Sequence, residues 1–342
     1  MANIVAVGGG TGTPVVLRGF KQNPAHHLTA IVAVTDSGGS TGRLRQEFGF
    51  LPVGDLRQCL AALAEENISD EMFNLLFYRF SGNGGLKGHN LGNLILTAFE
   101  DIKQSPGKAV ETVAKLFHAQ GNIYPVTETV ADLVVDYEDG SQQTGEHLLD
   151  DHTRGGKKIV KLTLTRPSQI YSKAKLALEE ADLIVLGPGD LYGSLVPHAL
   201  VNGFNEALKQ SSAPFVYIVN LMTHYSQTHH MTAKDHLDTV AAYFQRTPDV
   251  VVVNNGPISD ELLKAYAAQK EYPVKDDLPV NGTTKIIHGD FVSQVKIQLN
   301  SNDEVKRSLL RHDENKLVAS LEKIISPHRT AATPASPLDP AS

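Results

Sequence analysis

Three consecutive glycines, residues 8–10, directly follow an apolar run at residues 4–7. Glycine has no side chain, so the backbone N–H groups of such a loop can approach a ligand closely. A helical segment is expected over residues 15–21, with Thr13 as its N-cap and Pro14 at its first position. A strand, a glycine turn and a helix N-terminus together form an anion site, usually for phosphate. The alternative is a tight turn that binds no ligand.

The spacing of this loop excludes two common phosphate-binding motifs. No Lys-Ser/Thr pair follows Gly12, so the loop is not a Walker loop. The dinucleotide pattern G-x-G-x-x-G also fails, because its third position is Thr13 when counted from Gly8 and Val15 when counted from Gly10. We therefore predict a nucleotide site of another lineage, whose ligand contacts are Gly9, Gly10, Thr11, Gly12 and Thr13.

A second glycine-rich loop follows the next apolar run, residues 28–34. Asp36 lies just past this run, and in a doubly wound sheet that position is within reach of a ribose hydroxyl. The alternative is a turn aspartate that caps its own loop. Arg43, Arg45 and Arg57 follow, and three arginines beside two glycine loops favour a bound anion. The predicted contacts from this loop are Asp36, Ser37, Gly39 and Arg43.

A third glycine-rich loop, residues 81–93, leads into a helix expected over residues 94–102. It brings together His89, Asn90 and Asn93, whose imidazole and amide groups suit the recognition of hydroxyls and carbonyls. A lone histidine is more often structural, but the three residues as a cluster favour contact with a ligand.

A fourth loop, residues 187–194, follows a short buried strand expected at residues 182–186 and opens a helix expected over residues 195–208. A further strand, expected at residues 214–221, contains an asparagine near its end. The predicted contacts from these two segments are Gly187, Gly189, Asp190, Ser194 and Asn220.

Buried strands must position these loops. Apolar runs typical of strands buried on both faces recur at residues 4–7, 28–34, 182–186, 214–221 and 250–253. Helical segments separate them, and the C-terminal ends of such strands share one edge, where ligands bind. The sequence therefore predicts an α/β fold, a Rossmann-like three-layer sandwich with a mostly parallel central sheet. Loops 8–13, 36–43 and 187–194 should converge on one edge of it.

Residues 123–165 have a different character, with alternating strands around a turn at residues 138–141. They predict a small β insertion, an interaction or lid element to which we assign no chemistry. We expect one α/β domain over residues 1–325 that contains this insertion. Its last elements are short strands near residue 286 and at 295–299 and a helix over 314–325. The Ala/Pro/Ser-rich tail 330–342 is predicted to be disordered.

The composition is that of an ordinary globular protein, with 41% hydrophobic and 20% charged residues. The formal net charge of −7 argues against nucleic acid as a partner. The single cysteine, Cys59, excludes an intramolecular disulfide and a Cys-rich metal site. No signal peptide is recognisable, and no apolar run approaches about 18 residues. We therefore expect a cytoplasmic protein without a membrane span. Base rates of twofold pairing favour a homodimer.

Five motifs, in order and at similar spacing, give the chain a family resemblance: residues 8–12, 36–45, 52–57, 88–93 and 186–192. The chain resembles the gluconeogenesis-factor family (YvcK-like) over residues 1–325, a family related to the 2-phospho-L-lactate transferase CofD. The resemblance implies a cytoplasmic protein needed for growth and normal cell shape on gluconeogenic carbon sources. It also implies binding of a nucleotide sugar such as UDP-N-acetylglucosamine. The transferase relatives bind a guanine nucleotide and a deazaflavin, and they use Mg²⁺ held by aspartates.

This chain departs from the family pattern at Ser37, where members usually carry a second aspartate after Asp36. Mg²⁺ prefers carboxylates together with phosphate oxygens, so the change weakens a metal-dependent transferase interpretation and leaves Asp36 as a weak metal candidate. Tyr266 and Arg311 also resemble family residues. In that interpretation Tyr266 stacks on a base or sugar and Arg311 pairs with a diphosphate; the alternative for each is a structural role.

Three functions stay open at this point. The first is a nucleotide-sugar-binding regulatory protein without turnover, with a UDP-sugar as ligand. The second is a CofD-type phosphotransferase acting on a nucleotide-activated, phospholactate-like donor, which needs a metal and a second substrate pocket. The third is an NAD-binding enzyme, suggested by Asp36 after the second strand. Ser37 counts against the second and the missing third glycine against the third, so GDP and NAD remain alternative ligands. No catalytic residue is assigned.

Overall fold

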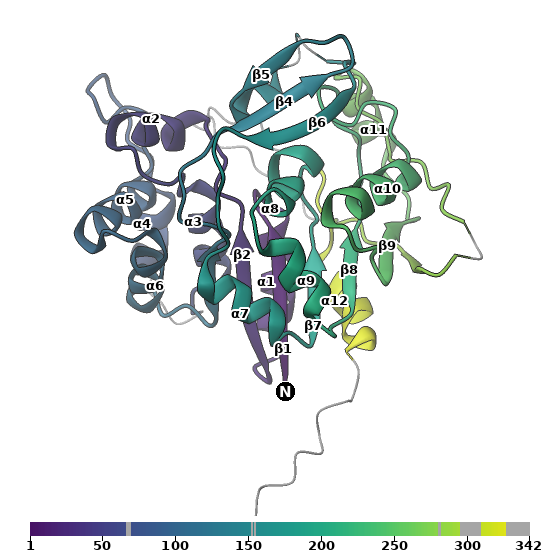
Figure 1. The fold of residues 1–342 in the computed structure, drawn as a ribbon, viewed down its shortest axis with the longest axis horizontal. Coiled ribbons are helices and arrows are strands. Elements are labelled where there is room, and N and C mark those ends of the chain that lie inside the picture. Colours follow the sequence, from purple (N-terminus) through teal and green to yellow (C-terminus); the bar gives the residue numbers. More distant parts are fainter. Residues whose placement is uncertain (66–69, 152, 154, 280–281, 295–308, 326–342) are drawn as a thin grey trace, which may run out of the picture.

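The computed structural model describes residues 1–65, 70–151, 153, 155–279, 282–294 and 309–325. Within these ranges a seven-stranded sheet forms the centre of the molecule, in the order β10-β9-β8-β7-β1-β2-β3 (Figure 1). All neighbouring strands are parallel. The strands are β1 (Ala2–Gly8), β2 (His26–Val32), β3 (Asn122–Pro125), β7 (Leu183–Leu186), β8 (Phe215–Ile218), β9 (Val250–Asn254) and β10 (Lys285–Gly289). The predicted α/β sandwich is confirmed.

The strand order reverses between β1 and β7. From β1 the chain builds outward through β2 to β3, and from β7 it builds in the other direction through β8 and β9 to β10. Right-handed crossovers in opposite directions place the connecting helices on opposite faces of the sheet. The crevice at such a reversal is where open α/β sheets bind ligands.

Helices cover both faces of the sheet. On one face α1 (Thr13–Lys21) packs between α3 (Gly54–Leu63) and α12 (Glu314–Leu321). The other face is in front in Figure 1 and carries α7 (Ser172–Glu179), α8 (Val196–Ala199), α9 (Phe204–Gln210) and α10 (Ala233–Phe244). The remaining helices are α2 (Gly39–Phe48), α4 (Asp70–Phe77), α5 (Leu91–Lys103), α6 (Pro106–Leu116) and α11 (Asp260–Ala267).

The predicted insertion is a separate antiparallel sheet of order β5-β4-β6, made of β4 (Leu133–Tyr137), β5 (Gln142–Thr144) and β6 (Ile159–Leu164). Figure 1 shows this sheet above the C-terminal edge of the central strands. Its predicted start at residue 123 was wrong, because Ile123 pairs with Ala30 in the central sheet. A 3₁₀ turn, η1 (Glu146–Asp150), joins β5 to β6 on the side of this edge.

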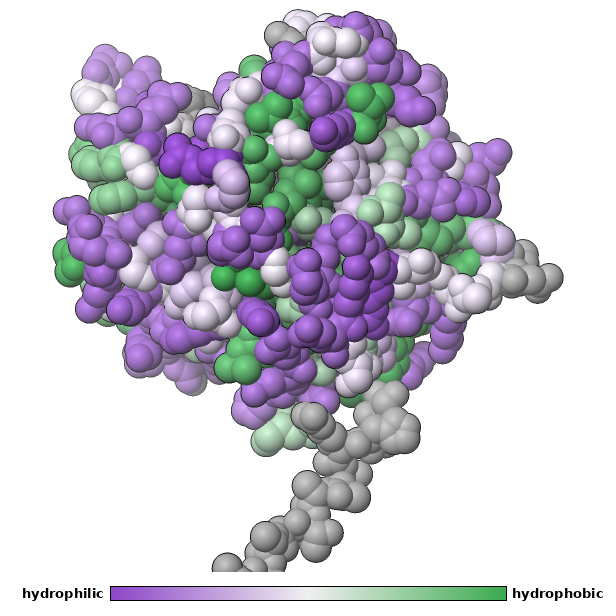
Figure 2. All heavy atoms as spheres, viewed as in Figure 1, coloured by the Kyte–Doolittle hydropathy of each residue, from purple (hydrophilic) through white to green (hydrophobic). Residues whose placement is uncertain are grey.

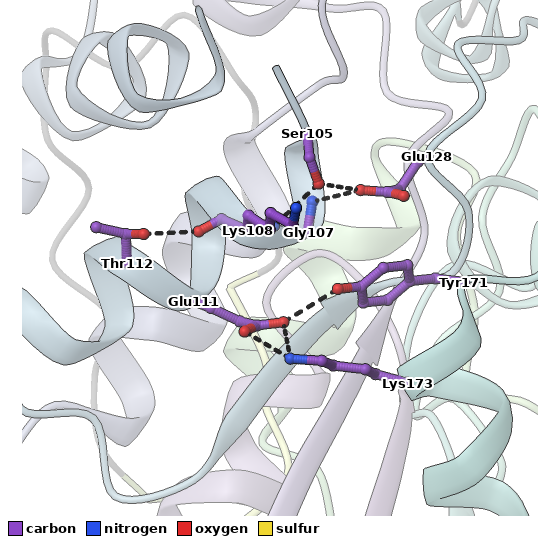
Figure 3. Close-up of polar contacts among 8 residues, drawn as sticks. All are labelled: Ser105, Gly107, Lys108, Glu111, Thr112, Glu128, Tyr171 and Lys173. Carbon is purple, nitrogen blue, oxygen red and sulfur yellow. Dashed lines mark hydrogen bonds and ion pairs between the residues drawn. The ribbon is translucent and has the colours of Figure 1, made fainter. Parts of the chain in front are cut away.

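Polar contacts with α6 hold both ends of the insertion (Figure 3). Ser105, the N-cap of α6, donates to the carboxylate of Glu128 at 2.6 Å, just before β4. Glu111 on α6 accepts from the Tyr171 hydroxyl at 3.0 Å and from the Lys173 ammonium at 2.7 Å, just after β6. The insertion is therefore anchored at its base rather than attached by free linkers.

The structure corrects three local expectations. The N-cap of α1 is Gly12 and not Thr13. Gly12 already has helical backbone geometry, and no side chain caps this helix. Residues 39–45, expected in a loop, form the first turns of α2. The helix expected over residues 195–208 is instead a π-helical turn, η3 (Leu191–Leu195), followed by α8 and α9. The strand expected at residues 295–299 and the tail 330–342 lie outside the described residues.

Candidate functional site

The loops after β1 and β7 are in direct contact at the reversal of strand order. A Cβ atom added at Gly12 would overlap the carbonyl oxygen of Pro188, so only glycine allows this contact. The loop after β8 joins them, since the side-chain oxygen of Asn220 accepts from the N–H of Gly189 at 3.3 Å. The predicted convergence of loops 8–13, 36–43 and 187–194 is confirmed, since Asp36 of the second loop lies beside Asp55, whose carboxyl group accepts from the N–H of Gly10.

Gly10, beside this contact, has room for a further atom. Its φ of +60° lies in the left-handed region, and the nearest atom to an added Cβ would be Ser194 Oγ, at 3.7 Å. By contrast, a Cβ at Gly9 would overlap the carboxylate of Asp55. Because the N-terminus of α1 follows directly, the loop presents backbone N–H groups and the positive end of a helix dipole to this space.

Five carboxyl groups from four segments lie close together beside this loop, in a region that we call the cleft: Asp36 after β2, Asp55 at the start of α3, Asp190 after β7, and Glu146 and Asp150 on η1. Burial, followed by the charge of the neighbouring Asp36, raises the pKa of Asp55 to about 7. Burial raises the pKa of Asp36 as well, and lifts the pKa of Glu146 well above its ordinary value. Asp150 has its pKa raised to about 6 by the same causes. The cleft therefore favours bound protons or a cation.

Two arginines near these carboxyl groups are engaged in structural contacts. Arg45 pairs with Asp132 of the insertion at 2.7 Å. Arg57 donates from Nε to the side-chain oxygen of Asn93 at 2.8 Å and from Nη1 to the carbonyl of Leu76 at 3.2 Å. Arg43 is exposed on α2 and donates to the carbonyl of Lys87, and contact of Arg43, Arg45 and Arg57 with a bound anion stays a prediction.

The Asp36 loop is tied to the insertion. Asp36 accepts from its own loop, at the N–H of Gly38, so the capping role considered as an alternative is present. The Ser37 hydroxyl lies 2.8 Å from His147 Nδ1 and accepts from the His147 backbone N–H at 3.1 Å. Ser37 thus holds η1, with Glu146, against the cleft. Gly39 is exposed at the start of α2.

His89, Asn90 and Asn93 support the loops that form the cleft. All three are buried. Asn90 is the N-cap of α5, where it accepts from the N–H of Asn93. His89 Nδ1 lies 3.2 Å from the Ser40 hydroxyl, and the Asn93 side chain accepts from Arg57. Because these groups already bond within the protein, their contact with a ligand stays a prediction.

A pocket of about 200 Å³ opens beside the loop after β7, at the ends of β8 and β9. Asn220 belongs to both sites, since it lines the pocket and bonds Gly189. The lining includes apolar groups and amides: Leu221, Val253, Asn254, Asn255, Pro273 and Val274. The pocket extends the cleft along the sheet edge.

Tyr266 and Arg311 lie on the pocket's side of the sheet. Tyr266 is buried in a small apolar cluster with Leu221, a residue of the pocket wall, and its hydroxyl accepts from the N–H of Leu310 at 2.9 Å. Arg311 is partly buried one residue further along. Stacking by Tyr266 and diphosphate pairing by Arg311 stay predictions.

Sequence reasoning missed three acidic residues of the cleft. Asp55 lay within a quoted motif, where a carboxylate at the start of a helix after a glycine was the available signal. Glu146 and Asp150 lie in the insertion, to which no chemistry was assigned, and the polar run around them gave no signal.

Comparison with known proteins decides the family. A sequence model of the family described as "2-phospho-L-lactate transferase CofD" matches residues 4–292. The chain belongs to the CofD family. Among relatives, it is 40% identical over 275 residues to a protein of Halalkalibacterium halodurans named "Gluconeogenesis factor", covering 80% of this chain and 83% of that one. A protein of Listeria innocua with the same name is 35% identical over 322 residues, covering 93% and 94%.

A solved structure agrees with this assignment to the CofD family. The crystal structure of a UPF0052-family protein from Bacillus halodurans superposes with a TM-score of 0.85 at 36% identity, covering 94% of this chain and 98% of that one. The CofD-family match spans β1 to β10, and so includes every segment that contributes a carboxyl group to the cleft. In the described part of this chain, no helix combines the length and apolar character needed to cross a membrane.

Proposed function

We propose that this CofD-family chain is a cytoplasmic gluconeogenesis factor that binds a nucleotide sugar of the UDP-N-acetylglucosamine type and acts without turnover. The open space at Gly10, between two glycine loops at the reversal of strand order, is the observation that carries the proposal. Relatives named as gluconeogenesis factors support the cellular part. That part is a requirement for growth and normal cell shape on gluconeogenic carbon sources.

In this proposal the diphosphate binds at the backbone N–H groups of residues 11–13, because the N–H of Gly10 already donates to the Asp55 carboxyl group. Three features support it: the space at Gly10 is free of protein atoms within 3.7 Å of an added Cβ, α1 begins at Thr13, and Ser194 faces the same space. Backbone donors at a helix N-terminus favour phosphate over neutral ligands. Asp36, partly exposed at the edge of the cleft, then accepts from a ribose or sugar hydroxyl.

The nucleobase occupies the pocket beside Asn220. Apolar walls from Leu221, Pro273 and Val274 cover a planar ring, while the amides of Asn220 and Asn255 suit the alternating donors and acceptors of a pyrimidine edge. Asn220 connects the two subsites through its bond to Gly189. A ligand with a base and a diphosphate therefore spans the cleft and the pocket.

A diphosphate beside five carboxyl groups needs positive charge. Asp36 and Asp55 suit Mg²⁺, since hard carboxylate oxygens of raised pKa face one another here and Mg²⁺ commonly takes one or two carboxylates plus phosphate oxygens and water. Within the described ranges no three acidic, histidine or cysteine side chains are placed to hold a metal by themselves. Mg²⁺ would therefore bind together with the ligand, and it would supply the charge that screens the phosphates from the carboxylates.

A CofD-type transferase is the second candidate. The family match supports it, and burial together with the charge of Asp36 raises the pKa of the Glu146 carboxyl group well above its ordinary value, which favours the protonated form. Such a group can donate a proton to a phosphate oxygen. Phosphorus NMR of the chain with UDP-N-acetylglucosamine or a GDP-activated donor separates the candidates, since turnover consumes the donor and binding alone does not.

The test compares two glycines of the same backbone type. Gly10 and Gly140 both have positive φ and room for a Cβ, but Gly140 lies in the β4–β5 turn, away from the cleft. Alanine at either position costs roughly 1–2 kcal/mol of backbone strain. Calorimetric titration with UDP-N-acetylglucosamine should show binding at least about tenfold weaker for Gly10→Ala, because its methyl group occupies the phosphate space. Gly140→Ala should bind like wild type.

Equal binding by the two variants would refute the phosphate role of the loop. Binding of NAD or GDP in preference to UDP-sugars, with the same response to Gly10→Ala, would keep the site and change the ligand. In cells, a strain lacking its own gluconeogenesis factor should recover growth and shape on a gluconeogenic carbon source with Gly140→Ala but not with Gly10→Ala.

A further inference from the structure

Helix α4 is apolar on both its inner and outer sides. Leu76 is fully buried and Met72, one turn earlier, packs against the core. On the outer side Phe73 and Phe77, also one turn apart, are 36% and 41% exposed, and their ring centroids lie 5.2 Å from each other. Neighbouring aromatic side chains exposed on the outer side of a helix are typical of a surface that another protein covers.

The apolar surface continues past the end of the helix. Tyr78 is 50% exposed, and Leu86 in the following loop is 49% exposed. Backbone bonds from Phe80 to His89 and from Gly88 to Phe80 fold this loop back beside the helix end. We name the set Phe73, Leu75, Phe77, Tyr78 and Leu86 the α4 face. In Figure 2 apolar residues interrupt the mostly hydrophilic surface at the left margin, in the region of α4 and α5 in Figure 1.

Charges of opposite sign flank the α4 face. Glu71 is exposed in the first turn of α4. At the other end Lys87 is exposed, and its carbonyl accepts from Arg43 Nη1 at 3.0 Å, which brings a second cation beside it. Along the helix axis the order is therefore acidic, apolar, basic.

We propose that the α4 face binds a second copy of this chain, with a twofold axis crossing α4 near Asn74. A twofold interface must be self-complementary, because the same patch is used by both subunits. Antiparallel pairing of α4 with its copy sets apolar residues against apolar residues and brings Glu71 of each chain opposite Lys87 of the other. It also aligns the two helix dipoles in the favourable antiparallel sense. A different protein would not require this acidic–apolar–basic order.

The interface is separate from the nucleotide cleft. None of the residues of the α4 face lines the pocket beside Asn220. The proposed dimer can therefore be tested without a nucleotide ligand.

Sedimentation equilibrium of the full chain at micromolar concentration tests the proposal. Wild type should have twice the chain mass of 37.0 kDa. Phe73→Glu should give monomer, because two buried carboxylates then face each other across the axis. The control is Leu176→Glu, which places the same charge at another exposed apolar residue, on α7, and should leave the dimer intact.

A charge exchange tests the orientation. Glu71→Lys and Lys87→Glu should each weaken the dimer at least about tenfold, since each places like charges at both ends of the interface. The double variant should regain the dimer. A monomeric wild type, or a dimer that Phe73→Glu leaves unchanged, would overturn the proposal. A dimer sensitive to Phe73→Glu but not restored in the double variant would overturn the antiparallel twofold arrangement. Circular dichroism establishes that each variant is folded.

Discussion

Asp55 offers the sharpest test of the electrostatics of the cleft. Its carboxyl group accepts from the N–H of Gly10 and lies near the carboxyl groups of Asp36 and Asp190. Burial, followed by the charge of Asp36, raises its pKa from the ordinary 3.8 to about 7. Between these two values the folded protein keeps a proton that the unfolded chain releases. The free energy of unfolding should therefore fall as pH rises through this window.

The size of the effect follows from the pKa values. Each unit of difference is worth about 1.4 kcal/mol, so an isolated group with this shift would destabilise the fold by up to about 4 kcal/mol above pH 7. Part of the pKa shift comes from the charge of Asp36, so the destabilisation belongs to the pair of carboxyl groups and not to Asp55 alone. We therefore expect Asp55→Asn to raise the free energy of unfolding at pH 8 by about 2 kcal/mol. At pH 5 Asp55 is already neutral, and the variant should match wild type within about 1 kcal/mol.

Urea unfolding in EDTA from pH 5 to pH 8 measures this difference. Wild type should lose stability across the range, and Asp55→Asn should lose clearly less. Asp101→Asn, on the exposed surface of α5, is the control and should follow wild type. Parallel pH profiles for wild type and Asp55→Asn, or a wild type that is more stable at pH 8 than at pH 5, would refute the reasoning.

Three further variants test the scaffold of the cleft. Asn93→Ala leaves the buried Nε of Arg57 without its side-chain acceptor and should cost about 2–3 kcal/mol in chemical unfolding; a loss below about 0.5 kcal/mol would show that water replaces the bond. Gly12→Ala forces a methyl group onto the Pro188 carbonyl, so unfolding should show a loss of about 1–3 kcal/mol and calorimetry a loss of ligand binding. Ser37→Ala removes the link to His147 and should weaken nucleotide-sugar binding severalfold while changing stability by less than about 1 kcal/mol. Unchanged binding would limit Ser37 to a loop contact.

The fold was predictable because its signals are local. The run at residues 4–7 and the glycines after it place β1 and its loop without any tertiary information, and Asp36 follows β2 by the same logic. The helix expected over residues 195–208 failed for a local reason too. Pro197 lies at the first turn of α8, and Gly203 has a φ of +89°, so one continuous helix cannot form.

The composition of the cleft was only half predictable. Glycine-rich loops can be recognised from their spacing in the sequence. The acidic residues of the cleft come together only when the chain folds. Glu146 reaches the cleft because Ser37 holds His147 of η1, across 110 residues of sequence. Arg57 looked like an anion ligand by its position, but the packing of α5 brings Asn93 to it. These contacts depend on how the insertion and the helices pack against the central sheet. No short sequence motif predicts such packing.

The crystal structure of this chain with UDP-N-acetylglucosamine and Mg²⁺ would test the central claim most directly. The account predicts diphosphate oxygens within about 2.7–3.2 Å of the backbone nitrogens of residues 11–13, with the base in the pocket beside Asn220. A nucleotide sugar bound elsewhere, with the space at Gly10 filled only by water, would contradict it.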